Sequence, residues 1–123
     1  RHYSDTMLMA MIDSDNSETI VEMMSYIQKN FRDISAEKLS EKFRYSKRQI
    51  FRLVQKYTGT TLGKLQEDLR MKHAARLLAD SDMTVEQIAA DCGYNSPNHF
   101  FSVFKKVHGI TPLEYRKKHR TKQ

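Results

Sequence analysis

One stretch of this sequence occurs twice, and the repetition restricts the possible folds more than any other feature. The segment ISAEKLSEKFRYSKRQIFRLVQKYTGTTLGKL begins at residue 34, and MTVEQIAADCGYNSPNHFFSVFKKVHGITPLEY begins at residue 83. With one extra residue, Asn95, allowed in the second copy, the two share capping hydroxyls, glycines and apolar positions, including Ser46 with Ser96, Phe51 with Phe101, Gly59 with Gly109 and Thr61 with Thr111. Chance similarity between helices would not preserve all three, so we infer one structural unit used twice.

Each copy has the pattern of two short helices joined by a tight turn. In the first copy, Ser35 and Ser46 can cap helices whose apolar positions recur at helical spacing, at Leu39, Phe43, Ile50, Leu53, Val54 and Tyr57. In the second copy, Thr84 and Ser96 are the caps, and the apolar positions are Val85, Ile88, Ala89, Cys92, Phe100, Val103, Phe104 and Val107. The pattern predicts two helix-turn-helix units, at about 35–57 and 84–107, with Arg44 and Gly93 in the turns.

Three further helices complete the predicted fold. One begins after Asn16 or Ser17, one links the units over about 61–79, and the last begins with Thr111 and Pro112. Only four glycines and two prolines occur, and no segment alternates in the manner of a strand. We therefore expect an all-α domain of about seven helices over residues 16–123. Residues 1–15, with an apolar Met-rich patch, are interpreted as a linker or the tail of a preceding domain.

Composition excludes several classes of protein. The single cysteine, Cys92, rules out an internal disulfide framework and fits a reducing compartment, so we expect a cytoplasmic protein and a buried, unreactive thiol. No apolar run approaches the ~20 residues that span a bilayer. No paired acids, nucleophile motif or phosphate loop suggest an enzyme, and the five histidines show no metal-binding spacing, so no cofactor or metal is expected.

Positive charge is concentrated in the two repeated segments. The formal net charge is +6, with +6 in residues 34–66 and +4 in residues 84–123, against −3 in residues 1–33 and −1 in residues 67–83. Clustered Lys and Arg on separate segments of a helical protein fit a polyanionic partner. The same charge would also keep a small domain soluble, so charge by itself does not decide between these interpretations.

The side chains opposite each apolar stripe are the candidates for contact with DNA bases. In the first copy these are Lys47, Arg48, Phe51, Arg52 and Gln55, and in the second Asn98, Phe101, Ser102 and Lys105. Arg pairs bidentately with guanine, Gln pairs with adenine, and an aromatic edge can pack on the thymine methyl. Alternatively, Arg48 and Arg52 only neutralise phosphates, and the two Phe rings only cover a gap between helices. The weaker basic character of the second copy predicts less sequence discrimination there.

Phosphate contacts are expected at helix starts and from nearby bases. Free backbone N–H groups and the positive end of the helix dipole attract anions, which favours Thr60 and Thr61 before the linking helix and Thr111 before the last one. Plain helix capping explains these threonines equally well. Lys56, Lys106 and Arg116 are the predicted basic partners of phosphate. A linking helix of about 18 residues is roughly 27 Å long, close to the ~34 Å between successive major grooves.

Residues 70–116, with the weaker segment 46–62, resemble the DNA-binding domain of AraC/XylS-type bacterial transcription regulators. The resemblance implies a seven-helix fold, promoter binding and an upstream sensing or dimerisation domain. It places base contacts at Arg48, Phe51, Arg52, Pro97, Asn98, Phe101 and Ser102. We therefore expect a sequence-specific domain that docks two reading helices in successive major grooves of double-stranded DNA. The alternative is a helical interaction module that docks RNA polymerase or a partner regulator.

Overall fold

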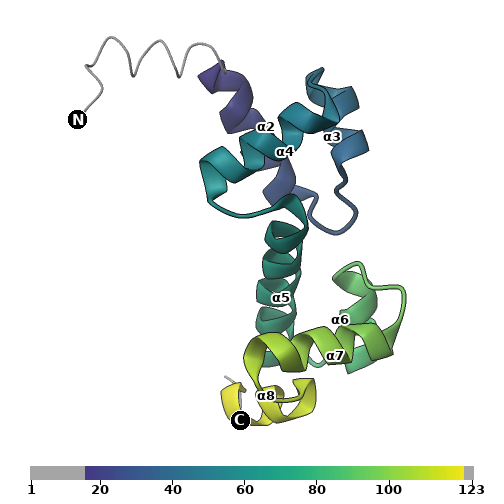
Figure 1. Cartoon of the computed structure of the whole chain (residues 1–123). Helices are drawn as coiled ribbons and strands as arrows, with labels where there is room; N and C mark the ends of the chain where they lie inside the picture. Colours follow the sequence, from purple (N-terminus) through teal and green to yellow (C-terminus); the bar gives the residue numbers. More distant parts are fainter. Residues whose placement is uncertain (1–15, 121–123) are drawn as a thin grey trace, which may run out of the picture. The chain divides into compact units, whose positions relative to one another are not determined.

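A computed structural model describes residues 16–120, and every regular element in that range is an α-helix (Figure 1). The predicted all-α fold of about seven helices is confirmed. The interpretation of residues 1–15 as a linker lies outside the described residues. Within them, no helix combines the length and apolarity needed to cross a membrane. The helices are α2 (Ser17–Lys29), α3 (Ala36–Phe43), α4 (Lys47–Thr58), α5 (Leu62–Asp80), α6 (Val85–Asp91), α7 (Pro97–His108) and α8 (Pro112–His119).

The chain divides into two compact units. Unit 1 contains α2, α3, α4 and the first residue of α5, and unit 2 contains the rest of α5 with α6, α7 and α8. Unit 2 also includes Phe31–Asp33, although this segment lies between α2 and α3 in the sequence. Each unit therefore contains one helix-turn-helix pair, α3 with α4 and α6 with α7.

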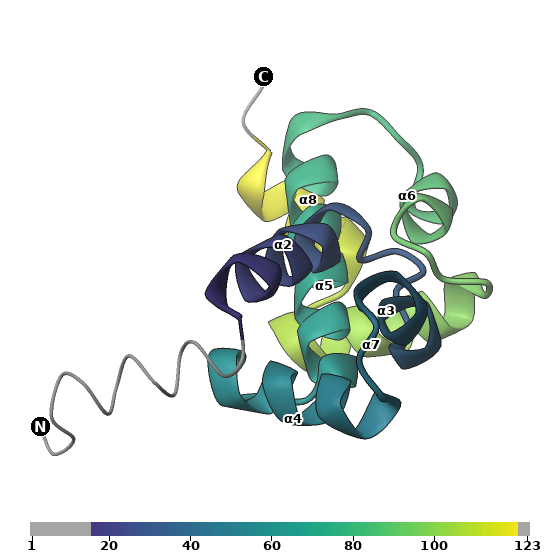
Figure 2. The same cartoon turned by 90° about the horizontal axis from the view of Figure 1, so that it is seen from above.

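Unit 1 is built on helices whose ends are set by local hydrogen bonds. The Ser35 hydroxyl accepts a hydrogen bond from the Lys38 N–H (3.1 Å), and Ser46 forms a reciprocal capping box with Gln49. Helix α3 packs against α4 and also contacts α2 (Figures 1 and 2). The buried apolar side chains of these three helices include Ile20, Met23, Ile27, Ala36, Leu39, Ile50, Leu53 and Val54.

Unit 2 has a core of its own, in which α5, α6 and α7 meet. Its buried members are Met71, Ala74, Leu78, Ile88, Ala89, Cys92, Tyr94, Phe100, Val103 and Phe104, with Tyr115 of α8 packed against them. Cys92 is buried, as expected from the sequence, and burial raises the pKa of its thiol to about 12. Met71 of α5 is only 1% exposed within this core.

Two predicted core positions are wrong, and they are equivalent in the repeat. Tyr57 is 39% exposed and Val107 is 37% exposed, each in the last turn of the longer helix of its pair. Helices α4 and α7 have 12 residues each, whereas their partners α3 and α6 have 8 and 7. The apolar spacing of each longer helix thus continues about one turn beyond the shorter helix packed against it. Tyr57 and Val107 lie in that last turn and remain partly exposed.

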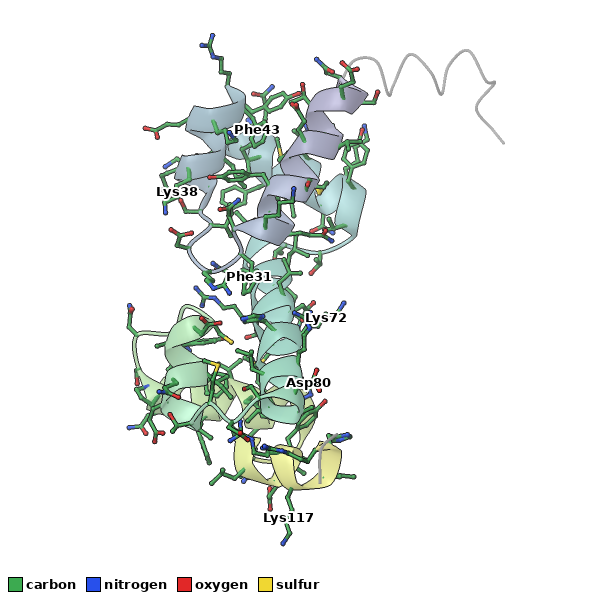
Figure 3. All side chains as sticks on the ribbon, turned by 180° about the vertical axis from the view of Figure 1, so that it is seen from behind. Phe31, Lys38, Phe43, Lys72, Asp80 and Lys117 are labelled. Atoms are coloured by element: carbon green, nitrogen blue, oxygen red, sulfur yellow. The ribbon has the colours of Figure 1, made fainter. Side chains whose placement is uncertain are left out.

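The segment Phe31–Asp33 is attached to unit 2 through backbone and side-chain bonds. Gln66 Nε2 donates to the Phe31 carbonyl (2.8 Å), and Arg70 donates to the Arg32 carbonyl (2.6 Å). The Phe31 ring lies beside α5, with its centroid 5.4 Å from that of His73 (Figure 3). Both carbonyls of this turn are therefore satisfied by side chains of one helix.

The Arg32 side chain completes this attachment. Its Nε donates to the Asp91 carbonyl (2.6 Å), and its Nη2 lies 3.3 Å from the Asp91 carboxylate. The same carboxylate is 2.6 Å from His73 Nε2, and these two bonds hold the pKa of Asp91 below its usual value. Arg32, His73 and Asp91 thus join the segment, α5 and the end of α6.

Gly93 turns the chain between α6 and α7 directly against this segment. Its φ is +99°, and a Cβ at this position would lie 2.5 Å from the Arg32 carbonyl oxygen. Both the backbone conformation and the close approach therefore require glycine. The equivalent turn of unit 1 uses Arg44, with φ 62°.

We predict that Gly93→Ala destabilises the protein by roughly 2 to 4 kcal/mol, since it adds left-handed strain to a clash with backbone. Gly63→Ala is the matched control, because Gly63 lies in α5 and a methyl group added there would have nothing within 4 Å. This control should leave stability unchanged or raise it by up to about 1 kcal/mol. Urea unfolding measures both, and equal effects would contradict the assignment.

A second prediction concerns His108, whose ring centroid lies 4.3 Å from that of Phe104. Its Nε2 is buried without a hydrogen-bond partner within the described part of the chain, and burial lowers the pKa of the imidazole. The unfolded chain therefore binds the proton more readily, and stability should fall as pH drops below about 6.5. Between about pH 7.5 and 5.5, the free energy of unfolding should fall less for His108→Phe than for the unsubstituted chain, as measured by urea unfolding at both pH values.

Candidate nucleic-acid interface

Helix α4 presents one face to solvent because its opposite face is fully buried. Ile50, Leu53 and Val54 are each 0% exposed, and this fixes the rotation of the helix about its axis. The opposite face carries the five side chains predicted from the sequence, all of them exposed: Lys47, Arg48, Phe51, Arg52 and Gln55. The structure therefore brings these five residues together on one surface of unit 1.

Helix α7 has the same arrangement in unit 2. Phe100, Val103 and Phe104 are buried, and Ser96 caps the helix ahead of Pro97. The predicted contact residues of this helix are all exposed: Pro97, Asn98, Phe101, Ser102 and Lys105. The repeat found in the sequence thus becomes two equivalent exposed helix faces, one in each unit.

Phe51 and Phe101 occupy equivalent places on these faces and remain largely outside the cores. Their exposed fractions are 53% and 40%, whereas the inward Phe100 and Phe104 are each 0% exposed. A ring that filled a gap between helices would be mostly covered, so these values favour a contact surface. Phe101 borders a hollow of about 410 Å³ that it shares with Pro97, Asn98 and Leu113.

The two faces differ in charge. Helix α4 contains Lys47, Arg48, Arg52 and Lys56 and no acid, whereas α7 contains only Lys105 and Lys106 as fixed positive charges. Lys47 pairs with Glu37 of α3 (3.3 Å), but both side chains are exposed, so the pair is weak in water. The face of unit 1 is the more suitable of the two for an anionic partner.

Two of the residues predicted to bind phosphate have other roles in the structure. The Arg116 guanidinium points inward and donates to the carbonyls of Leu78, Ser81 and Met83, at 3.0, 3.2 and 2.7 Å. It satisfies carbonyls at and after the end of α5, where the helix itself offers no partners. Its assignment to phosphate is therefore corrected to a structural role.

Thr111 is the second case. Its N–H donates to the Glu114 carboxylate (2.8 Å), and its hydroxyl accepts from the Glu114 N–H (3.1 Å). These bonds place a negative charge at the start of α8 and hold the pKa of Glu114 below its usual value. Capping, the alternative considered from the sequence, thus accounts for Thr111, and a phosphate would meet a carboxylate at this helix start.

The start of α5 has a different character. Its first turn contains no acidic residue, and Thr60 and Thr61 immediately precede it. The Thr60 N–H donates to the Thr58 hydroxyl (3.3 Å). Lys56 and Lys106 are both exposed, and Lys106 also lies 3.4 Å from Glu67. These four residues remain candidates for contact with phosphate.

Several positioning residues were missed in the sequence. Arg70 lies over the Tyr94 ring, with 4.7 Å between the guanidinium carbon and the ring centroid, while also bonding to the Arg32 carbonyl. Tyr94 begins the connection into α7, so this contact helps to fix where that helix starts. The sequence could have indicated these residues, because Arg70 and His73 are three positions apart in α5 and therefore lie on the same face of that helix.

Comparison with known proteins identifies relatives of this arrangement. A family model described as a helix-turn-helix domain matches residues 39–118. The HTH-type transcriptional activator RhaS of Salmonella arizonae is 30% identical over 104 residues, which are 84% of this chain and 37% of that protein. The chain thus spans little more than a third of the length of this relative.

Two solved structures share the fold. One is a transcriptional regulator from Chromobacterium violaceum, described as an AraC-type DNA-binding domain-containing protein, with TM-score 0.76, 28% identity, and coverage of 89% of this chain and 99% of that one. The other is the DNA-binding domain of the global transcriptional factor AdpA in complex with a target DNA. Its TM-score is 0.75 at 26% identity, with coverage of 81% and 91%.

We predict that Phe51→Ala and Phe101→Ala each lower stability by at most about 1.5 kcal/mol, because both rings are already substantially hydrated. Phe104→Ala, which empties a fully buried site, should cost about 3 to 5 kcal/mol. Thermal or urea unfolding of the three variants measures the contrast. A loss at Phe51 or Phe101 as large as that at Phe104 would show that these rings are structural.

Proposed function

The chain belongs to the AraC-type family of helix-turn-helix domains, and from this premise we propose that it is the sequence-specific DNA-binding domain of a transcription regulator. The observation that carries the proposal is the duplicated exposed face, in which the second helix of each helix-turn-helix pair, α4 or α7, presents basic, amide and aromatic side chains away from its core. Helices of this kind enter the major groove in helix-turn-helix proteins.

Helix α4 supplies the stronger base recognition. We assign Arg48 and Arg52 to guanine, since their planar guanidinium groups match its O6 and N7 acceptors. Gln55 can bond to adenine in the same manner, and Phe51 packs on a thymine methyl. Lys47, at the first position of the helix, completes the set. The four bases and absence of acids on α4 support this assignment.

Helix α7 recognises DNA mainly through shape and apolar contact. Asn98 and Ser102 can bond to base edges, while Pro97 and Phe101 offer apolar surface. Lys105 adds a positive charge nearer the C-terminal end of α7. With fewer fixed charges than α4, this face should discriminate less between sequences.

Contacts with the DNA backbone are proposed for Lys56, Lys106, Thr60 and Thr61. Lysines act on phosphate as point charges, and the acid-free first turn of α5 suits an anion near the two threonines. Such contacts position the protein without reading sequence. Neither Arg116 nor Thr111 is included, because internal bonds already engage their donors.

We also propose that the two units dock in successive major grooves of promoter DNA, and that this domain acts in the cytoplasm within a longer regulator. The duplicated face supports the first point, since each unit carries its own reading helix. The RhaS relative, of which this chain spans 37%, supports the proposal of a longer regulator. An upstream sensing or dimerisation domain and contact with RNA polymerase would belong to that longer protein.

Selection of binding sites from random DNA, followed by footprinting, tests the proposal directly. We expect enrichment of one sequence, with protection over about two turns of the duplex. Affinity should also fall steeply as salt is raised, because bound phosphates release counterions. The absence of any enriched site, or a binding constant insensitive to salt, would overturn DNA recognition and favour a protein-interaction module.

The assignment of Arg48 is tested with two substitutions. Arg48→Ala should weaken binding to the selected site by about 1 to 3 kcal/mol and binding to random DNA by much less, and Arg52→Ala should behave similarly. Arg48→Lys keeps the charge but loses the bidentate fork, so it should reduce specificity while preserving the salt dependence. Lys56→Ala is the matched control and should weaken all sequences alike. Fluorescence anisotropy titrations measure each constant.

Equal losses on selected and random DNA for Arg48→Ala would assign this residue to phosphate instead.

A further inference from the structure

Helix α2 has one side that faces away from the core of unit 1. Its buried residues are Ile20, Met23 and Ile27. Helical spacing places a second stripe on the opposite side of the helix, at intervals of three or four residues: Glu18, Glu22, Ser25 and Lys29. The three charged side chains of this stripe are exposed, and Ser25 is partly buried. The stripe is therefore in contact with solvent along most of the helix.

Apolar side chains border this stripe. The ring of Phe43 on α3 has its centroid 5.9 Å from that of Tyr26 on α2 (Figure 3). Both rings line a hollow of about 520 Å³ together with Val21, which is 67% exposed. Val21 also borders an apolar hollow of about 390 Å³ with Met24 and with Tyr57 in the last turn of α4. Exposed apolar surface rimmed by charged residues is typical of a site for another protein.

Charge divides this surface into an acidic half and a basic half. Glu18 and Glu22 lie toward the start of α2, whereas Lys29 lies in its last turn. Lys42, in the last turn of α3, adds a second base to the latter half, with its Nζ 5.0 Å from the centroid of the Tyr26 ring. Such a surface is complementary to itself, because a two-fold rotation places the acidic half of one copy against the basic half of the other.

We propose that this surface is the interface of a homodimer, in which α2 packs antiparallel against α2 of a second copy. The association face consists of Glu18, Val21, Glu22, Ser25, Lys29, Lys42 and Phe43. Ser25 lies nearest the two-fold axis, where its small side chain permits close approach of the two helices. Glu22 of each copy then meets Lys29 and Lys42 of the other. A surface of one sign would select a different protein, whereas two acids and two bases on one face select a second copy.

The association face contains no residue of α4 or α7, so the side chains assigned to DNA remain outside it. The proposal therefore does not rest on DNA recognition. Helix α2 has 13 residues and is about 20 Å long, which limits the interface to a small area. We accordingly expect a weak dimer that dissociates on dilution.

Reversal of one charged half at a time in the full 123-residue chain tests the interface. Glu18→Lys with Glu22→Lys makes the face wholly basic, and Lys29→Glu with Lys42→Glu makes it wholly acidic. Each double variant should self-associate at least about tenfold more weakly than the unsubstituted chain, because attraction between the halves becomes repulsion. An equimolar mixture of the two variants should regain association to within about threefold, since every half again meets its opposite. Sedimentation velocity over a concentration series measures each constant.

Glu41→Lys with Glu86→Lys is the matched control, because it makes the same change in net charge at exposed positions outside the association face. This variant should retain self-association. An equal loss in the control would overturn the proposal, since net charge and not the face would then govern association. A mixture that stays monomeric, or an unsubstituted chain that is monomeric at every concentration, would overturn it as well.

A disulfide test needs no change of charge. Ser25→Cys lies nearest the two-fold axis and should form a linked dimer under mild oxidation at least about tenfold faster than Glu41→Cys, because a disulfide joins Cα atoms only about 4.4 to 6.8 Å apart. The native Cys92 is buried, with its pKa raised to about 12, and should not compete. Equal rates for the two variants would contradict the antiparallel arrangement. All of these measurements are made without DNA, so their outcome is separate from that of the binding-site selection.

Discussion

The burial of one apolar stripe on each reading helix is the interaction on which the rest of the structure depends. Ile50, Leu53 and Val54 in α4 are completely covered, as are Phe100 and Phe104 in α7, and their neighbour Val103 is nearly so. A helix held by such a stripe cannot rotate about its axis without exposing it, so the side chains on the opposite face are fixed in direction. The identity of the exposed face is thus a consequence of core packing.

A second constraint is the satisfaction of backbone groups at the ends of short helices. Reciprocal capping boxes begin α4, α6 and α8, and Arg116 bonds to three carbonyls at and after the end of α5. These roles engage polar and basic side chains that composition alone would assign to a nucleic acid. The basic residues available to a nucleic acid are consequently fewer than the net charge suggests, since Arg116 is engaged inside unit 2.

The two units use the same scaffold for different surfaces. Unit 1 combines four basic residues on α4 with an apolar hollow beside the last turn of that helix. Unit 2 has fewer fixed positive charges on α7 and an aromatic group in its core, in which Phe104, His108 and Tyr115 are in contact. Segment Phe31–Asp33 belongs to this second unit and meets Gly93 at the turn before α7. Duplication therefore preserved the helix pair while the surroundings of each pair diverged.

The sequence by itself determined the features that depend on neighbours a few residues away. Helical spacing, caps and glycines located the helices, and the same period separated the inward stripe from Arg48, Phe51, Arg52, Asn98 and Phe101. Only the tertiary structure decided where a partner helix ends, which left Tyr57 and Val107 partly exposed, and which basic residue turns inward, as Arg116 does. It also decided that Arg32 meets Asp91 and that Gly93 faces the Arg32 carbonyl. The physical reason is range: capping and periodicity act within about one or two helical turns, whereas these contacts join residues more than thirty positions apart, and local pattern carries no information about such pairs.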